Sequence, residues 1–153
     1  MKFIFSLETV LRDREIKKNE AEKEYREALN KADKQRLQIN KMRNDLANAR
    51  RETQRVRQGG GHLAAALVSI EEFIVGQKIR TARQSEILKG LEDIAEQKRL
   101  VLVEVHKDFK ALEKLKEKKY EEFKKEKAKK ELKFLDEVSV MRAARSHLNE
   151  DGI

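Results

Sequence analysis

Apolar side chains recur at alternating spacings of four and three residues along most of this chain, and that repeat constrains its fold more than any other feature. Such a repeat places one apolar stripe along an α-helix and is typical of coiled coils. The chain has no proline, so no helical position must lose a backbone donor. Nine of the eleven residues in the first series are apolar: Ala21, Tyr25, Ala28, Ala32, Gln35, Ile39, Met42, Leu46, Ala49, Thr53 and Val56.

The same spacing extends backward to Leu7, which predicts a first helix beginning near Ser6, a favourable N-cap residue. Three consecutive glycines, Gly59 to Gly61, end the pattern, and each costs a helix interior about 1 kcal/mol relative to alanine. The predicted elements are therefore a first helix over about residues 6–58, a turn at about 59–62 and a second helix over about 63–148.

A second series with the same spacing follows the glycines: Leu63, Leu67, Ile70, Ile74, Gln77, Thr81, Gln84, Leu88, Leu91, Ala95, Lys98, Leu102, Val105, Phe109 and Leu112. If the two series face one another in antiparallel helices, pairs whose residue numbers sum to 123 bring a positions opposite d positions, as for Leu11 and Leu112. A register shifted by seven residues fits equally well. Burying a large seam side chain contributes roughly 1.5–3 kcal/mol, against about 0.2–0.5 kcal/mol for an exposed ion pair, so we expect the seam to hold the fold.

The predicted fold is all-α: one coiled-coil domain over residues 1–153, formed by a long antiparallel two-helix hairpin with an overhanging C-terminal helix. The overhang arises because Leu7 already pairs near residue 116, while helical sequence continues to Leu148. Two interpretations of this overhang stay open, a surface that binds a partner and a solvated, charged tail. Its amphipathic residues are Tyr120, Phe123, Lys127, Lys130, Phe134, Met141, Ala144 and Leu148.

The composition argues against an enzyme. Charged residues make up 42% of the chain and aromatic residues 5%, which is too polar for an ordinary globular core. With no cysteine and three widely separated histidines, the sequence offers neither a thiolate nucleophile nor metal-ligand spacing. The glycine triplet lacks the lysine and hydroxyl residue of a phosphate-binding loop. We therefore expect no catalytic residue, no cofactor and no metal.

The net charge of +8 comes from 36 basic and 28 acidic residues that are mixed along the chain. Nucleic-acid binders concentrate positive charge and often add aromatic side chains for stacking, so no nucleic acid is expected as a partner. The N-terminus does not resemble a signal peptide, and no run approaches the roughly 20 apolar residues of a membrane-spanning helix. We expect a soluble, cytosolic protein that contacts the membrane only peripherally.

A second apolar stripe lies one residue off the seam, at the g positions of the second helix. Its members, spaced by multiples of seven residues, are Phe73, Ile87, Ile94 and Val101. Positions e and g of a two-stranded coil normally carry glutamate or lysine. The stripe is therefore interpreted either as a site for another helix or protein, or as a widened seam.

Both ends of the chain resemble the bacterial flagellar export protein family FliJ. The residues that carry the resemblance are FIFSL at 3–7, VLRDRE at 10–15 and KELKFLDE at 130–137, followed by Arg142. Length, basic charge, the lack of cysteine and proline, and a central hairpin also match over essentially the whole chain.

The resemblance implies a non-enzymatic, cytoplasmic component of the flagellar type III export apparatus, located peripherally at the inner face of the cell membrane. Members of the family resemble the central stalk of rotary ATPases. They insert their joined helix ends into the export ATPase hexamer, promote its assembly and activity, engage the cytosolic domain of the export gate with their tip region, and contact export chaperones. The alternatives are the equivalent stalk of a virulence injectisome and, more remotely, a basic coiled-coil protein that binds nucleic acid.

The resemblance also suggests binding residues. Phe73 matches an aromatic position of the gate-binding patch, although Gln77 stands where the patch tends to continue with an aliphatic residue. We expect the export gate to bind the stripe formed by Phe73, Ile87, Ile94 and Val101. We expect the export ATPase to bind the joined ends through Phe3, Phe5, Leu7, Phe134, Leu135, Met141 and Leu148.

Overall fold

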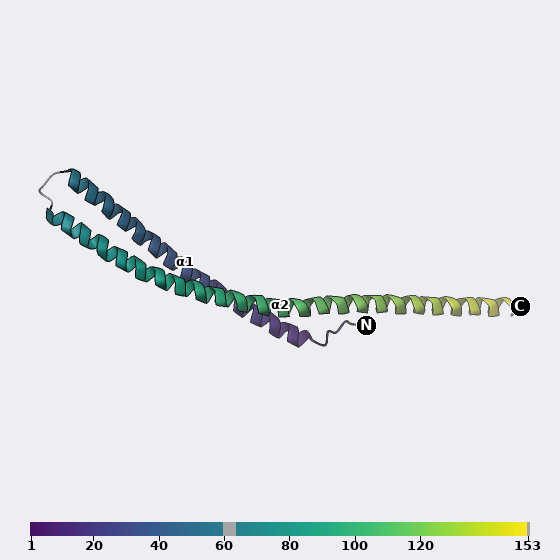
Figure 1. Ribbon diagram of the computed structural model, residues 1–153. Coiled ribbons are helices and arrows are strands. Elements are labelled where there is room, and N and C mark those ends of the chain that lie inside the picture. The colour runs from purple at the N-terminus through teal and green to yellow at the C-terminus, as the bar shows by residue number, and fades with distance from the viewer. Residues whose placement is uncertain (60–63, 153) are drawn as a thin grey trace. The chain divides into compact units, whose positions relative to one another are not determined.

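Two long helices make up nearly all of the protein, as a computed structural model shows (Figure 1). The structure describes residues 1–59 and 64–152. Helix α1 spans Glu8–Gln58 and helix α2 spans Ala64–Glu150, with no strand among the described residues. The predicted all-α fold of two long, mutually packed helices is therefore confirmed. Apart from Gly59, the residues of the predicted turn lie outside the described residues.

The first helix begins at Glu8, two residues later than Ser6. The Leu11 amide donates to the Leu7 carbonyl over 2.8 Å, which makes Leu7 the N-cap residue, and the Glu8 amide donates to the Phe5 carbonyl over 3.1 Å. The predicted N-cap at Ser6 is therefore wrong. A serine N-cap is worth about 1 kcal/mol, whereas the turn at Phe5 lets that residue bury its ring, which contributes roughly 1.5–3 kcal/mol.

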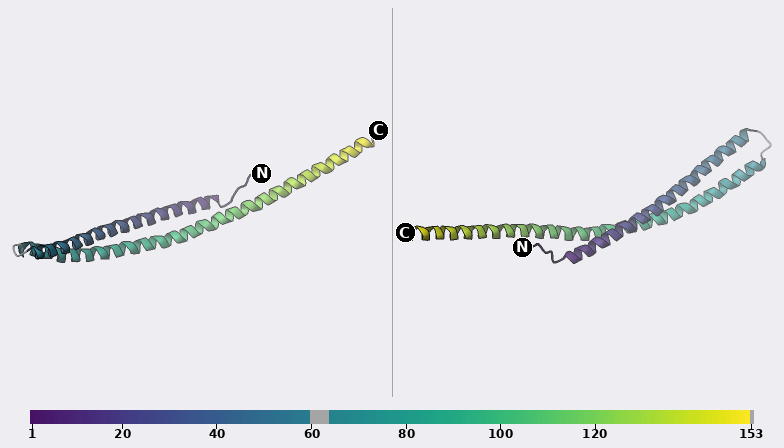
Figure 2. Two further views of the ribbon diagram at one scale, coloured as in Figure 1. Left: turned by 90° about the horizontal axis from the view of Figure 1, so that it is seen from above. Right: turned by 180° about the vertical axis from the view of Figure 1, so that it is seen from behind.

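The chain divides into two compact units, and the two helices pass through both. The central unit comprises Lys17–Val105, and the terminal unit comprises Met1–Ile16 with His106–Ile153. Within the central unit the helices run antiparallel and side by side (Figure 2). Within the terminal unit, ion pairs of Glu8 with Lys116 at 2.8 Å and of Arg14 with Asp108 at 3.8 Å show that the helices are also antiparallel.

The core of the central unit is the predicted seam. Across residues 17–59 and 64–105, Ile39 is the one large side chain that is almost completely buried, with 1% of its surface exposed. Alanines fill most of the other buried positions, whereas larger seam residues such as Leu46, Ile74 and Leu88 are only partly buried. The buried apolar residues among those described for this unit are all predicted seam residues: Ala21, Ala28, Ala32, Ile39, Val56 and Ala95.

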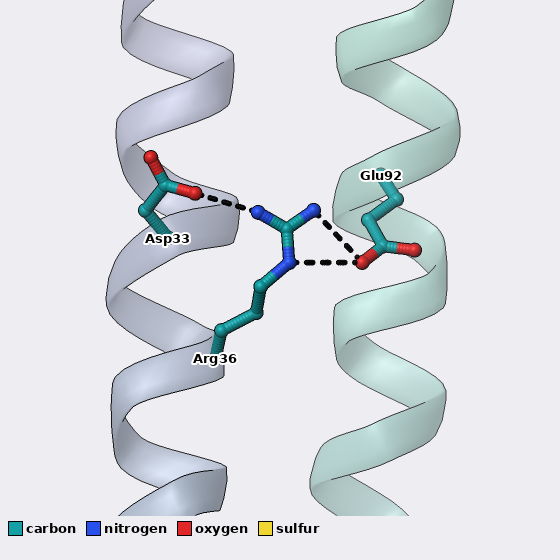
Figure 3. Close-up of polar contacts among 3 residues, drawn as sticks. All are labelled: Asp33, Arg36 and Glu92. Carbon is teal, nitrogen blue, oxygen red and sulfur yellow. Dashed lines mark hydrogen bonds and ion pairs between the residues drawn. The ribbon is translucent and has the colours of Figure 1, made fainter.

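Ion pairs beside the seam identify its register. Arg36 pairs with Glu92 at 3.0 Å while also contacting Asp33 at 2.6 Å (Figure 3). Arg57 pairs with Glu71 at 3.2 Å. All four residues of these two interhelical pairs occupy e positions. The two residue numbers of each pair sum to 128. This sum is expected when the facing a and d residues of the two helices have numbers that sum to 123. A shift by seven residues would separate both pairs.

Glutamine amides form the middle of the seam. Gln77, which is only 5% exposed, donates to the Met42 carbonyl across the interface at 3.1 Å. Gln35 donates to the side-chain and backbone oxygens of Gln84, at 2.6 and 3.0 Å. The buried Thr81 hydroxyl has no hydrogen-bond partner among the described residues, which costs about 1–3 kcal/mol. Directional hydrogen bonds thus replace apolar contacts over this part of the interface.

Substitution of Ile39 should show how much the seam contributes. Ile39→Ala removes a side chain that is 1% exposed and should lower the free energy of unfolding by about 2–4 kcal/mol. Leu37→Ala, two residues away but 70% exposed, should change it by less than about 0.5 kcal/mol. Urea unfolding followed by far-ultraviolet circular dichroism measures both. Equal losses in the two variants would contradict the seam assignment.

Candidate protein-binding surfaces

The N-terminal segment of residues 1–7 packs on α2 within the terminal unit. The Phe3 ring contacts Tyr120 edge-on, with 5.2 Å between the ring centroids, and Phe123 at 5.5 Å in a tilted arrangement. Each such aromatic pair is worth about 0.5–1.5 kcal/mol beyond the area that it buries. Phe5 is buried as well. Two of the residues predicted to bind the ATPase are therefore occupied in holding this segment against α2.

Surface hollows flank the segment. One, of about 620 Å³, is lined by residues 1–7 together with Leu115, Lys119 and Phe123. Another, of about 520 Å³, lies between Leu11, Phe109 and Tyr120 and is largely apolar. Phe3 lines both hollows. Loss of its ring would therefore join two apolar surfaces that are now separate.

The remaining predicted ATPase-binding residues are more accessible. Leu7 lies at the N-terminus of α1 and is partly exposed. Phe134, Leu135, Met141 and Leu148 are all well exposed on the last turns of α2. Of these four, Phe134 lines a small surface pocket that also includes Met1. Phe134 therefore lies near the first residue of the chain, but Phe3, Phe5 and Leu7 line a different hollow. The convergence of these three residues with the C-terminal residues stays a prediction.

Sequence reasoning did not identify Tyr120 and Phe123 as the partners of the N-terminal aromatic residues. Both had been placed in an overhang without a partner. The available signal was two aromatic residues three apart within the lysine-rich stretch that follows the last seam residues.

Local ion pairs neutralise part of the charge in the lysine-rich stretch of α2. Residues 113–133 contain ten lysines and six glutamates. Lys124 pairs with Glu121 at 2.9 Å and lies over the Tyr120 ring at 4.7 Å from its centroid. The hydrogen bond that Lys124 donates to the Glu121 carboxylate raises the pKa of Lys124. Because such exposed pairs are worth little for stability, this stretch mainly presents a solvated, mixed-charge surface.

The g-position stripe of the central unit lies at the surface. Phe73 is 41% exposed, and Ile87, Ile94 and Val101 are about half exposed. Arg80 occupies the g position between Phe73 and Ile87, and its guanidinium lies 5.7 Å from the centroid of the Phe73 ring. The sequence signal for this contact is an arginine seven residues after Phe73 in the same stripe.

Other kinds of site are not evident in the part of the chain that the structure describes. Those residues include no group of three or more histidine, aspartate or glutamate side chains placed to bind a metal. Neither helix, over its described length, has a stretch long and apolar enough to span a lipid bilayer.

The fold and these surfaces define an α-helical coiled-coil hairpin protein whose accessible features are apolar surfaces on α2. A sequence model of the flagellar FliJ protein family matches residues 2–148. The chain therefore belongs to the FliJ family, as the resemblance suggested, and is a component of the flagellar protein export apparatus. No curated protein and no solved structure matches it.

Removal of the Phe3 ring should release the N-terminal segment. Phe3→Ala loses both aromatic contacts, so exchange of the Glu8 amide, which donates to the Phe5 carbonyl, should accelerate by about tenfold or more. Ile4→Ala is the matched control, because the neighbouring Ile4 is 81% exposed. Similar exchange in both variants would contradict an anchoring role for Phe3.

Proposed function

We propose that this protein is a non-enzymatic stalk that couples the export ATPase ring to the membrane export gate at the inner face of the cell membrane. The observation that carries the proposal is the FliJ family match over residues 2–148. Two separate exposed apolar surfaces, one on the last turns of α2 and one around Phe73, support it. The match to a flagellar family favours the flagellum over a virulence injectisome.

The last turns of α2 form the proposed ATPase-binding surface. Phe134, Met141 and Leu148 are spaced by seven residues and so share one face of the helix. All three are exposed, and basic residues such as Arg142 and Arg145 lie between them. A shaft inside an ATPase ring needs apolar contacts for affinity and charges that distinguish the ring's subunit interfaces, and this face supplies both.

The N-terminal aromatic residues have a supporting role in this proposal. Phe3 packs on Tyr120 and Phe123 of α2 and Phe5 is buried, so these two residues hold the N-terminal segment at the base of the exposed turns. Leu135 and the partly exposed Leu7 extend the proposed contact. Ring binding then promotes ATPase assembly and hydrolysis, because one shaft contacts several subunits at once.

The stripe of Phe73, Ile87, Ile94 and Val101 forms the proposed binding surface for the cytosolic domain of the export gate. Phe73 is the largest of the four, and 41% of its surface is exposed. An aromatic side chain of this kind is a common anchor at protein interfaces. Contacts with export chaperones complete the proposed set of partners.

Substitutions on α2 test the ATPase surface. The double variant Met141→Ser with Leu148→Ser should abolish most stimulation of the export ATPase, because it removes two exposed apolar contacts from one face. Leu132→Ser is the control, since Leu132 is equally exposed but lies roughly 160° around the helix from Phe134. ATP hydrolysis by the purified ATPase is measured with each variant.

A deletion extends the same test. Removal of residues 134–153 should also abolish stimulation yet keep the helices packed, because the buried residues of the described chain all lie outside this segment. Full stimulation by the shortened chain would show that the C-terminal end of α2 does not contact the ATPase.

Phe73→Ala tests the gate surface. The variant should weaken binding of the gate's cytosolic domain by about tenfold or more, as for an interface anchor, and leave the helical content unchanged. Ile79→Ala is the control, because Ile79 is 52% exposed on another face of α2. Calorimetric titration and circular dichroism give the two readings. A Phe73→Ala protein that unfolds would assign Phe73 to the core instead.

A further inference from the structure

Arg80 interrupts the apolar stripe between Phe73 and Ile87, yet its side chain is held against the stripe. The guanidinium lies 5.7 Å from the Phe73 ring centroid. Its Nε and Nη2 donate to the Gln77 side-chain oxygen at 3.1 and 3.0 Å. An aromatic ring and a guanidinium arranged in this way attract one another. Phe73 and Arg80 therefore present one combined surface rather than two independent side chains.

Gly76 makes this position of Arg80 possible. A Cβ atom at Gly76 would lie 2.9 Å from Arg80 Nη1, so the guanidinium, which is the far end of a flexible side chain, would have to shift. Any other residue here would push the guanidinium away from its present position. A glycine inside a helix costs about 1 kcal/mol of stability relative to alanine. Gly76 nevertheless leaves open the space that the Arg80 guanidinium occupies.

Gln77, a buried residue of the seam, also fixes the position of the Arg80 guanidinium. Gln77 is buried and donates to the Met42 carbonyl of α1 at 3.1 Å, so its amide has a defined orientation. The oxygen that accepts from Arg80 therefore has a fixed place relative to both helices. Ordering of the guanidinium before a partner arrives reduces the entropy lost on binding.

The charge around Arg80 indicates what the surface would bind. Residues 76–90 contain four basic residues and one acidic residue, and the facing residues 33–47 contain four basic and two acidic residues, so together they hold five of the chain's eight excess positive charges. Among the described residues, Arg80 contacts Gln77 and Phe73 and forms no ion pair with a carboxylate. Its charge is thus available to an acidic partner.

We propose that Gly76 positions Arg80 beside Phe73 as a second docking residue, and that the pair recognises a protein segment in which a carboxylate neighbours an apolar side chain. The apolar group packs on Phe73 and the carboxylate accepts hydrogen bonds from the guanidinium. This inference rests on the proposed docking of the export gate at Phe73, and it makes Arg80 a determinant of specificity for an acidic segment of that partner.

Two glycine substitutions separate this role from helix stability. Gly76→Ala and Gly90→Ala occupy the same heptad position of α2, and a Cβ at Gly90 meets nothing within 4 Å. Both variants should raise the melting temperature, because alanine favours the helix. Only Gly76→Ala should weaken calorimetric binding of the gate's purified cytosolic domain, by roughly two- to fivefold, the range expected for an exposed cation–π contact.

Arg80 variants complete the experiment. Arg80→Gln should weaken binding at least as much as Gly76→Ala and should flatten its dependence on salt, while Arg80→Lys should restore the affinity only in part, because lysine lacks the planar fork.

Equal binding by the two glycine variants, or undiminished binding by Arg80→Gln, would overturn the inference. If Phe73→Ala also binds normally, the proposed gate docking fails with it. If Phe73→Ala alone weakens binding, only the role of Arg80 fails. If the Arg80→Gln variant binds phosphatidylglycerol vesicles more weakly but binds the gate domain normally, the surface would instead be assigned to lipid.

Discussion

The seam between α1 and α2 is the interaction on which every other feature of this protein depends. Helices this polar would not persist alone in water, because most helical stability in proteins comes from packing an amphipathic face. Here the packing rests on Ile39, a set of alanines and two glutamine contacts between the helices. A two-stranded coil covers only one stripe on each helix, so side chains beside the seam stay accessible. The same geometry that holds the fold thus leaves the surfaces that a non-enzymatic protein needs.

Much of the fold could be predicted because the heptad repeat translates directly into burial. Ile39, Ala32 and Ala95 were seam residues in the sequence and are buried in the structure. The ends of α1 and α2 fall close to those expected from the repeat and the glycine triplet. The family followed from short motifs at both ends of the chain, which the match over residues 2–148 confirms. The exposure of the g stripe also follows from position alone, since a g residue adjoins the seam without entering it.

What could not be predicted depends on three-dimensional contacts that a periodic pattern does not contain. A repeat of seven cannot distinguish registers that differ by seven, and only ion pairs such as Arg36 with Glu92 separate them. The start of α1 moved from Ser6 to Glu8 because a local capping preference yielded to contacts of Phe3 and Phe5 with α2. The position of Arg80 depends on the missing Cβ of Gly76, an effect visible only with the side chains in place.

The polar middle of the seam has a thermodynamic consequence. Apolar surface exposed on unfolding raises the heat capacity and polar surface lowers it. A seam in which Gln35, Gln77, Thr81 and Gln84 replace aliphatic residues therefore gives a small heat-capacity change for the length of the chain. The curve of stability against temperature is correspondingly flat, so cooling weakens this coiled coil less than it weakens a globular domain of equal size.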